Sequence, residues 1–446
     1  MTNSKPPQGD TARGVIGELV RFLEIQILDI APSCRPFISF YSPLIRSSAI
    51  QLTPLSLVLQ PTQNSQKYHT AEMSNSSQSR LFKPLKVGNI ELQNRIVLAP
   101  LTRFRADDAH VPLPFVAEYY AQRACVPGTL LITEATFIAP LAGGYGNAPG
   151  IYSQAQIESW KKVTAAVHEK GSFIYLQLWA VGRAADPTQL QKEFGEHGIV
   201  KSASDIAFEG GAKPTPLTEA EIKEYIFLYA QAAKNAIEAG FDGVEVIAAN
   251  GYLIDQFLQD TSNNRTDAYG GSIENRARFG VEVTKAIVEA IGAERTGIRL
   301  SPFSPFQGMK MADPKPQFTY FAEQLKKLNL SYVHLVESRI SGNATIDAVD
   351  KVDFLLDVWG TNSPVLVAGG FKPDTAKKAV DKEYPNREVA IVFGRYFTSN
   401  PDLVFRIREH IELMPYNRDL FYNKKEVEGY TTWPFSKEFK AQVAKS

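Results

Sequence analysis

The chain has 446 residues and carries 48 Lys and Arg side chains against 48 Asp and Glu, so its formal net charge is zero. This balance argues against a nucleic-acid or membrane-surface partner, and no apolar run approaches the roughly 18 residues that span a bilayer. Two cysteines, Cys34 and Cys125, exclude a disulfide framework and have no metal-ligand spacing, which favours a reducing, cytoplasmic location.

Residues 1–75 differ in composition from the rest of the chain. They mix Ser, Gln, Pro and Asn with short apolar runs, and the acidic residues Glu18, Glu24 and Asp29 argue against a transit peptide. Regular strand-like and helix-like patterns begin only after Met73. We therefore expect a low-order N-terminal extension over residues 1–75, one folded domain over residues 76–446, and a functional chain that begins near Met73.

Short apolar runs recur between longer amphipathic segments in the remaining sequence. Runs of this length and β-branched content are typical of buried strands, and the segments between them are typical of helices. Eight strand–helix repeats predict a (β/α)₈ barrel with insertions. A doubly wound sheet is the alternative, which the lack of a G-x-G-x-x-G turn after the first strand disfavours. The eight predicted strands lie at residues 95–99, 129–133, 173–178, 243–247, 296–300, 332–336, 364–368 and 389–393.

The helix before the fourth strand has the clearest predicted boundaries. Thr218 and Glu221 have the spacing of a capping box, and Gly240 supplies a stop. Between them, apolar residues recur at the spacing of one helix face. Residues 272–291 show the same pattern, so we predict a second long helix there.

Polar residues near the ends of the first and third strands are candidates for ligand binding, because barrels bind ligands at the C-terminal ends of their strands. The first strand is followed by Thr102, which taken alone is more often a turn residue. On the third strand, Tyr175, Gln177 and Trp179 share one face, and a buried amide there needs a polar partner. A core amide bonded to the backbone and a ligand-binding amide explain Gln177 equally well.

The fourth and fifth strands carry the most unusual polar residues. The fourth strand leads into a loop in which Asn250 and Tyr252 should project just beyond the strand end. The fifth strand places Arg299 within an apolar run, where a buried guanidinium costs several kcal/mol unless an anion pairs with it. A structural partner such as Glu245 and an anionic ligand are equally good explanations for Arg299.

Glycines follow the seventh and eighth strands. Gly369 and Gly370 come directly after the seventh strand, and Gly394 and Arg395 come after the eighth. Glycines let backbone N–H groups approach a ligand, and the usual phosphate site of such barrels lies between these two loops. With Arg395 as a charged donor, the pattern predicts a phosphate-bearing ligand.

Two long stretches, residues 240–260 and 263–279, occur in order and are followed by a third at residues 297–302. Together they resemble the old yellow enzyme family of flavin-dependent ene-reductases, most closely its fungal members, from about Leu81 to about Phe435. The resemblance implies an FMN-binding (β/α)₈ barrel over residues 76–446 that takes hydride from NADPH and reduces a C=C bond conjugated to a carbonyl. It implies a small-molecule enone-type substrate and a monomeric or homodimeric chain.

The resemblance also implies roles for individual residues. It assigns Thr102 to the flavin O4, Gln177 to the pyrimidine edge of the flavin, and Arg299 to the negative charge near N1 and O2. The full implied set of FMN contacts is Pro100, Leu101, Thr102, Ala135, Gln177, Arg299, Gly369, Gly370, Gly394 and Arg395.

Five residues match the family's catalytic and substrate-binding positions. Tyr252 matches the proton donor to the substrate, Asn250 matches a hydrogen-bond donor to the substrate carbonyl, and Trp179 and Tyr422 match residues that shape the substrate pocket. The chain departs from the family at one of these positions, because Ile247 stands where a His usually gives the carbonyl a second donor.

This departure leaves two other functions open. One is a flavin-dependent isomerase or specialised biosynthetic enzyme without net reduction, and the other is a flavin-binding protein whose catalysis has decayed. None of the six histidines follows the fourth strand, and the sequence has neither a His pair at i, i+4 nor a cysteine cluster. We therefore expect no metal site, and the lack of a G-x-S-x-G elbow argues against a hydrolase.

Overall fold

Within residues 79–445, which are those that the computed structural model describes, eight short parallel strands close into a barrel. The ring closes because β15 pairs with β3, β3 with β4, and β4 with β6. Each strand coincides with one of the eight apolar runs, so the predicted (β/α)₈ barrel is confirmed. The strands are β3 (Ile96–Leu98), β4 (Leu130–Ile132), β6 (Phe173–Trp179), β9 (Gly243–Ala248), β10 (Thr296–Leu300), β11 (Tyr332–Val336), β14 (Val365–Ala368) and β15 (Val389–Phe393).

The predicted N-terminal extension and the expected start at Met73 lie outside the described residues.

Shorter strands lie outside the ring of eight barrel strands. β1 (Leu85–Val87) and β2 (Ile90–Leu92) form an antiparallel hairpin, and their apolar side chains pack with those inside the barrel. The others are β5 (Thr136–Phe137), β7 (Lys201–Ser202), β8 (Thr215–Pro216), β12 (Ile340–Ser341) and β13 (Ala344–Thr345).

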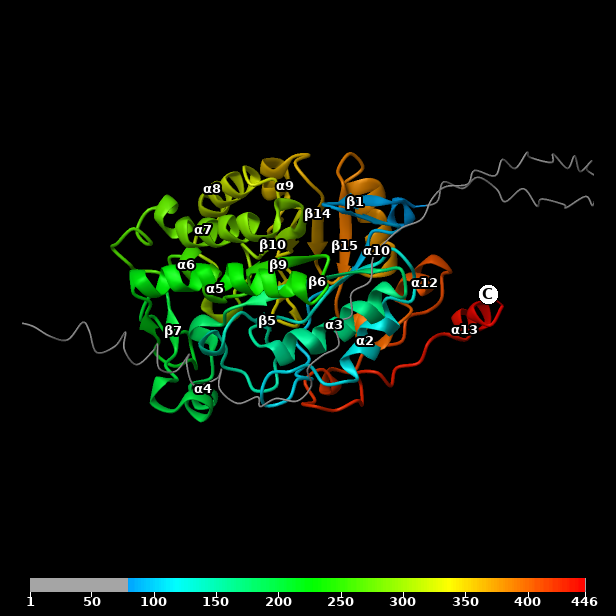
Figure 1. Ribbon diagram of the computed structural model, residues 1–446. Coiled ribbons are helices and arrows are strands. Elements are labelled where there is room, and N and C mark those ends of the chain that lie inside the picture. The colour runs from blue at the N-terminus through cyan, green and yellow to red at the C-terminus, as the bar shows by residue number, and fades with distance from the viewer. Residues whose placement is uncertain (1–78, 446) are drawn as a thin grey trace, which may run out of the picture. The chain divides into compact units, whose positions relative to one another are not determined.

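Helices surround the strands, with α5, α7 and α8 following one another beside β9 and β10 (Figure 1). No helix in the described part of the chain is long and apolar enough to span a membrane. The helices are α2 (Val116–Arg123), α3 (Gln154–His168), α4 (Pro187–Phe194), α5 (Glu219–Glu238), α6 (Leu253–Leu258), α7 (Ile273–Ile291), α8 (Lys315–Lys326), α9 (Asp353–Trp359), α10 (Pro373–Lys378), α11 (Arg395–Ser399), α12 (Leu403–Arg408) and α13 (Lys437–Val443).

The boundaries of α5 are set by the predicted cap and stop. The Glu221 N–H donates to Thr218 Oγ1 at 3.2 Å, and the Thr218 N–H donates to Glu221 Oε2 at 2.8 Å. These reciprocal bonds satisfy donors that the first turn of a helix leaves free. The helix ends at Glu238, and Gly240 follows with φ of +86°, which glycine adopts without steric cost.

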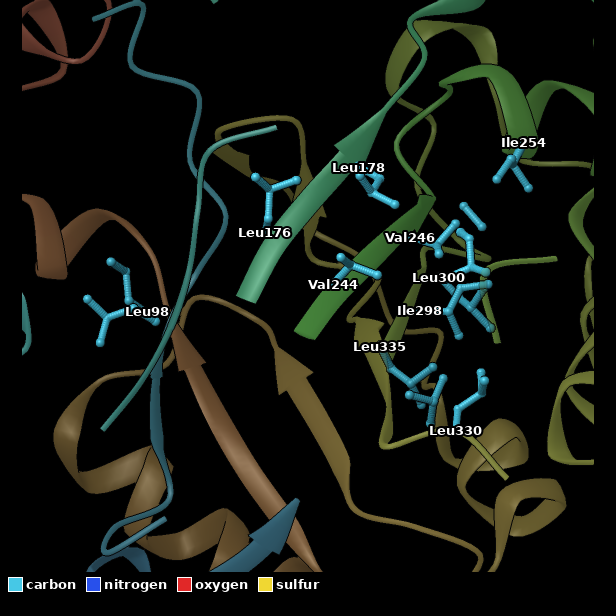
Figure 2. Packing of buried hydrophobic residues seen from close by; sticks show 14 of the residues in the cluster. Leu98, Leu176, Leu178, Val244, Val246, Ile254, Ile298, Leu300, Leu330 and Leu335 are labelled. Atoms are coloured by element: carbon cyan, nitrogen blue, oxygen red, sulfur yellow. The ribbon is translucent and has the colours of Figure 1, made fainter. Parts of the chain in front are cut away.

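Side chains on each barrel strand alternate between two packing environments. On one face they pack against the helices, as Val244 and Val246 of β9 and Ile298 of β10 do (Figure 2). On the other face they fill the barrel interior. Val97, Leu130 and Leu366 form part of an apolar layer there, together with the side chains of β1 and β2. This alternation follows from the two-residue period of a strand.

Two tyrosines pack inside the barrel beside two glycines. The rings of Tyr175 and Tyr332 lie 5.6 Å apart, and Tyr332 pairs in register with Gly297 on the neighbouring strand. A Cβ at Gly297 would lie 2.3 Å from the Tyr332 ring, and one at Gly243 would lie 2.6 Å from the Tyr175 ring. The glycines are therefore needed to make room for the rings.

We predict that Gly297→Ala lowers the free energy of unfolding by about 1 to 3 kcal/mol, because the added methyl group overpacks the barrel interior. The measurement is urea denaturation of the purified protein. The same substitution in a Tyr332→Leu background should cost at least about 1 kcal/mol less, because the ring that it meets is gone. Additive costs would show that the cost of the methyl group does not come from the Tyr332 ring and that the glycine serves another purpose.

Candidate active site

A cavity of about 480 Å³ lies at the C-terminal ends of the barrel strands. Of the fifteen residues that the sequence analysis singled out for cofactor or substrate, fourteen line this cavity, and Trp179 is the exception. The fourteen are Pro100, Leu101, Thr102, Ala135, Gln177, Ile247, Asn250, Tyr252, Arg299, Gly369, Gly370, Gly394, Arg395 and Tyr422. Eight separate strand ends and loops therefore converge on one space.

The cavity has a floor with two chemically different halves. On the side of β6 and β10, Gln177 and Arg299 line it with an amide and a guanidinium. On the side of β3, β14 and β15, small apolar side chains line it, namely Ala99, Ala368 and Val392. This division matches a flat ring that has one polar edge and one apolar edge.

A buried carboxylate lies beneath the polar half. Glu245 on β9 is fully buried, and its Oε1 accepts a hydrogen bond from Gln177 Nε2 at 2.7 Å. Its Oε2 accepts from the Tyr332 hydroxyl at 3.1 Å and is 2.8 Å from His334 Nδ1. Burial opposes ionisation, but His334 and Arg299 outweigh it and lower the pKa of Glu245. The carboxylate is therefore charged at neutral pH.

Arg299 lies close to this network, but the network does not provide an acceptor for every N–H group of its guanidinium. Burial lowers the pKa of Arg299, and the charge of Glu245 opposes that shift. In the described part of the chain, the buried Nε of Arg299 has no hydrogen-bond partner. Glu245 thus explains part of why a guanidinium is tolerated here, and the donors of Arg299 leave room for an anionic or carbonyl-bearing ligand.

Hydrogen bonds to side chains of α6 hold the turn that carries Asn250 and Tyr252. Asn250 has φ of +57°, and its N–H donates to Ser301 Oγ at 2.7 Å. The Gly251 N–H donates to Asp255 Oδ2 at 2.9 Å, and Gln256 Nε2 donates to the Gly251 carbonyl at 2.7 Å. Burial raises the pKa of Asp255 to about 7. These bonds hold the turn so that both side chains line the cavity.

Ile247 lines the cavity beside Arg299, to which it is paired in register between β9 and β10. It packs in one apolar cluster with Trp179 and Tyr252. Trp179 lies one layer behind the cavity wall, since it is buried and its ring packs edge-on against Tyr252 with centroids 5.0 Å apart. Trp179 therefore does not line the cavity itself but contacts Tyr252, which does.

The loop after β3 is clamped to the C-terminal segment. Buried Glu134 accepts hydrogen bonds from the Arg103 and Phe104 N–H groups at 2.9 and 3.2 Å. The Arg103 guanidinium in turn donates to the Phe421 and Gly429 carbonyls, both at 2.9 Å. This clamp positions the residue before Arg103, which is Thr102, and the residue after Phe421, which is Tyr422. The only sequence signal was a pair of arginines, Arg103 and Arg105, in the loop that follows the strand.

A hairpin between β12 and β13 forms part of the cavity rim, which the sequence analysis missed because its strands are two residues long. Asn343 at its tip donates from Nδ2 to the Tyr422 hydroxyl at 3.1 Å, and Arg418 Nη1 donates to the Asn343 carbonyl at 3.0 Å. At the base of the hairpin, Arg395 Nη2 donates to Thr345 Oγ1 at 2.8 Å. The hairpin thus links the predicted phosphate side of the cavity to its entrance.

The residues present fit FMN. Gln177 and Arg299 offer polar groups to a pyrimidine edge, and the apolar half of the floor suits a dimethylbenzene ring. Arg395 is the charged donor on the far side, where Gly370 has φ of +65°. A Cβ at Gly369 would lie 2.8 Å from Arg339 Nη2, so the Arg339 side chain would have to shift to admit a larger residue at this point. Within residues 79–445, no group of three or more metal-ligating side chains lies together.

Comparison with known proteins places the chain in a family. The model of the NADH:flavin oxidoreductase / NADH oxidase family matches residues 80–414. A chanoclavine-I aldehyde reductase of Penicillium roqueforti, fgaOx3, is 58% identical over 365 residues, which cover 82% of this chain and 99% of the relative. A Claviceps fusiformis protein named probable inactive dehydrogenase easA is 49% identical over 372 residues, which cover 81% and 96%.

Solved structures agree with this placement. The crystal structure of Old Yellow Enzyme from Pichia sp. AKU4542 matches with a TM-score of 0.74 at 43% sequence identity, and the match covers 80% of this chain and 94% of that one. The family model spans most of the described residues, and the relatives are matched over nearly their whole length. The chain therefore belongs to the NADH:flavin oxidoreductase / NADH oxidase family and is an oxidoreductase of the old yellow enzyme type.

Proposed function

We propose that this chain is an FMN-dependent ene-reductase that uses NADPH and reduces a C=C bond conjugated to a carbonyl, with an α,β-unsaturated aldehyde as the favoured substrate class. The observation that carries the proposal is that Gln177, Arg299 and Arg395 meet Asn250 and Tyr252 at one cavity. The 58% identical relative named as an aldehyde reductase supports the choice of aldehyde. NADPH is carried over from the resemblance to the old yellow enzyme family.

Three residues would hold the cofactor. Arg299 and Gln177 would bind the pyrimidine edge of FMN, and Arg395 would bind its phosphate. When bound, FMN would supply the site that accepts hydride from NADPH and passes it to the substrate β-carbon. The positive charge of Arg299 would stabilise negative charge on that edge, in a site that Ala99 and Val392 keep apolar on the other side.

Two residues on one turn would act on the substrate. Asn250 would donate a hydrogen bond from Nδ2 to the carbonyl oxygen, which polarises the conjugated bond. Tyr252 would donate its hydroxyl proton to the α-carbon. Burial raises the pKa of Tyr252, so the phenol keeps its proton at neutral pH and is available as a general acid. Because Asp255 and Gln256 fix the turn, both donors keep one geometry relative to the barrel.

Two observations support a second candidate function, that of a flavin-binding protein whose catalysis has decayed. The 49% identical relative carries the name probable inactive dehydrogenase, and residue 247 of this chain is an alkyl group where the resemblance implies an imidazole donor. A decayed flavin-binding protein would not oxidise NADPH with a quinone as acceptor. An isomerase would give a product with the mass of its substrate, whereas a reductase adds two hydrogens.

The cofactor prediction is that the purified protein is yellow and releases FMN on denaturation. Arg299→Met and Arg395→Met should each weaken FMN binding to the apoprotein by at least about tenfold, because a charged hydrogen-bond donor contributes about 1.5 to 3 kcal/mol. Arg278→Met, which removes an exposed arginine outside the cavity, is the matched control. A colourless protein that takes up no added FMN would overturn the proposal.

The proton-donor prediction separates two half-reactions of Tyr252→Phe, followed by flavin absorbance in a stopped-flow instrument. The rate at which NADPH bleaches the flavin should be nearly unchanged. The rate at which an enone restores the absorbance should fall by about 10² or more, which is the usual contribution of a general acid. An equal loss in both rates would mean that Tyr252 has a structural role and that the acid lies elsewhere.

The substrate-pocket prediction concerns Ile247→His. The new imidazole should give the carbonyl oxygen a second donor and speed the reaction of the reduced protein with cyclohexenone by at least about tenfold. The gain should stay below the full value of a donor, about 10² to 10³, because the surrounding packing fits Ile. Ile247→Val, which changes volume without adding a donor, is the control. No gain in a variant that still binds FMN, and that still binds a phenol added as a probe of the substrate pocket, would show that residue 247 does not face the carbonyl.

A further inference from the structure

Glu245 has no role in the proposed mechanism, although four described side chains depend on it. It has 0% exposure and lies beneath the cavity floor, where Gln177 and Arg299 separate it from the cavity. Both of its oxygens are occupied, since Gln177, Tyr332 and His334 all bond to them. A buried carboxylate with three donors and a nearby guanidinium is fully compensated only while every partner is in place.

The carboxylate determines which end of the Gln177 amide faces the cavity. An ionised carboxylate only accepts hydrogen bonds, so the atom that contacts Glu245 Oε1 at 2.7 Å must be the Gln177 amide nitrogen. The amide carbonyl is therefore left for the cavity, where it accepts a hydrogen bond from a ligand N–H group. Without the carboxylate, both amide orientations would be possible.

The carboxylate also offsets the charge of Arg299. Glu245 and Arg299 lie on neighbouring strands, and each favours the charged form of the other. His334 lies between the same partners, and burial lowers its pKa, so at neutral pH it donates to Glu245 as an uncharged imidazole. The layer beneath the cavity thus holds one negative and one positive charge.

We propose that Glu245 is a positioning residue that sets the reduction potential of the bound flavin, by fixing the Gln177 amide and by offsetting the charge of Arg299. This inference rests on the proposed function. Reduction adds negative charge to the flavin, and a carboxylate beneath the pyrimidine edge disfavours that charge. Its presence keeps the flavin a stronger hydride donor than Arg299 alone would allow.

The test is Glu245→Gln, which keeps the side-chain volume and removes the charge. The holoenzyme is reduced slowly in the presence of a reference dye, and the ratio of reduced to oxidised flavin is read at a fixed dye potential. We expect this ratio to rise at least about tenfold over that of the unmodified protein, which for a two-electron couple corresponds to about 30 mV. A ratio within about twofold of the unmodified protein would overturn the inference, because a purely structural role would leave the potential unchanged.

A second pair of variants keeps the inference testable if Glu245→Gln does not retain FMN. Tyr332→Phe removes one donor to the carboxylate, leaves its charge less compensated, and should lower the ratio at least about twofold. Tyr175→Phe is the matched control, because Tyr175 lies in the same ring pair but bonds to the Glu294 carbonyl, and its ratio should not change. Equal ratios for these two variants would overturn the inference.

The outcomes also separate this inference from the proposed function. If the unmodified protein takes up no FMN, the proposed function fails and the inference fails with it. If the unmodified protein binds FMN and reduces an enone while the Glu245 and Tyr332 variants keep its potential, only the inference fails.

Discussion

A guanidinium buried inside a closed β-barrel is the constraint on which the functional half of this structure depends. Burying an unpaired charge costs several kcal/mol, so Arg299 requires an opposite charge within the barrel. Glu245 supplies it from the neighbouring strand, and Glu245 in turn requires donors for both of its oxygens. Gln177 and His334 meet that need because β6, β9, β10 and β11 are consecutive in the barrel. One buried charge thus accounts for a polar layer that spans four strands.

The rest of the site is built around this layer with two kinds of support. The turn that carries Asn250 and Tyr252 is bonded to α6, whose residues are all buried, so its geometry is fixed by the core. The entrance is held by exposed contacts between the β12–β13 hairpin and the C-terminal segment, such as the one from Asn343 to Tyr422. Under the proposed function, rigid donors beside the substrate and weaker contacts at the entrance would suit a site that admits two reactants in turn. Ile247 adds an apolar side chain to the cavity wall beside Arg299. Under the proposed function, it would favour a substrate that finds its second carbonyl donor elsewhere.

The sequence was sufficient for the barrel and for the residues at its strand ends, because strand length, helix caps and the position of Arg299 are local patterns. The capping box of Thr218 and Glu221 is one such pattern, and the structure contains it. Glu245 was named from the sequence as a structural partner for Arg299, but its hydrogen-bond network was beyond local reasoning, since those partners come from two other strands and depend on register. The strand face on which Trp179 lies was predicted from its spacing, but its ring packs behind Tyr252. The residue pattern along one strand does not give the direction in which a ring points. The β12–β13 hairpin was missed because two-residue strands have no periodicity to detect.

A crystal structure of the protein with FMN bound is the most direct test of whether the buried charge pair organises the pyrimidine end of a flavin site. We expect the pyrimidine edge to lie against Gln177 and Arg299, with the Gln177 carbonyl oxygen accepting a hydrogen bond from the ring. The phosphate should lie against Arg395, and Asn250 and Tyr252 should face the open side of the ring. A flavin bound with its phosphate at Arg299, or with its ring outside the barrel end, would show that the charge pair does not organise the site.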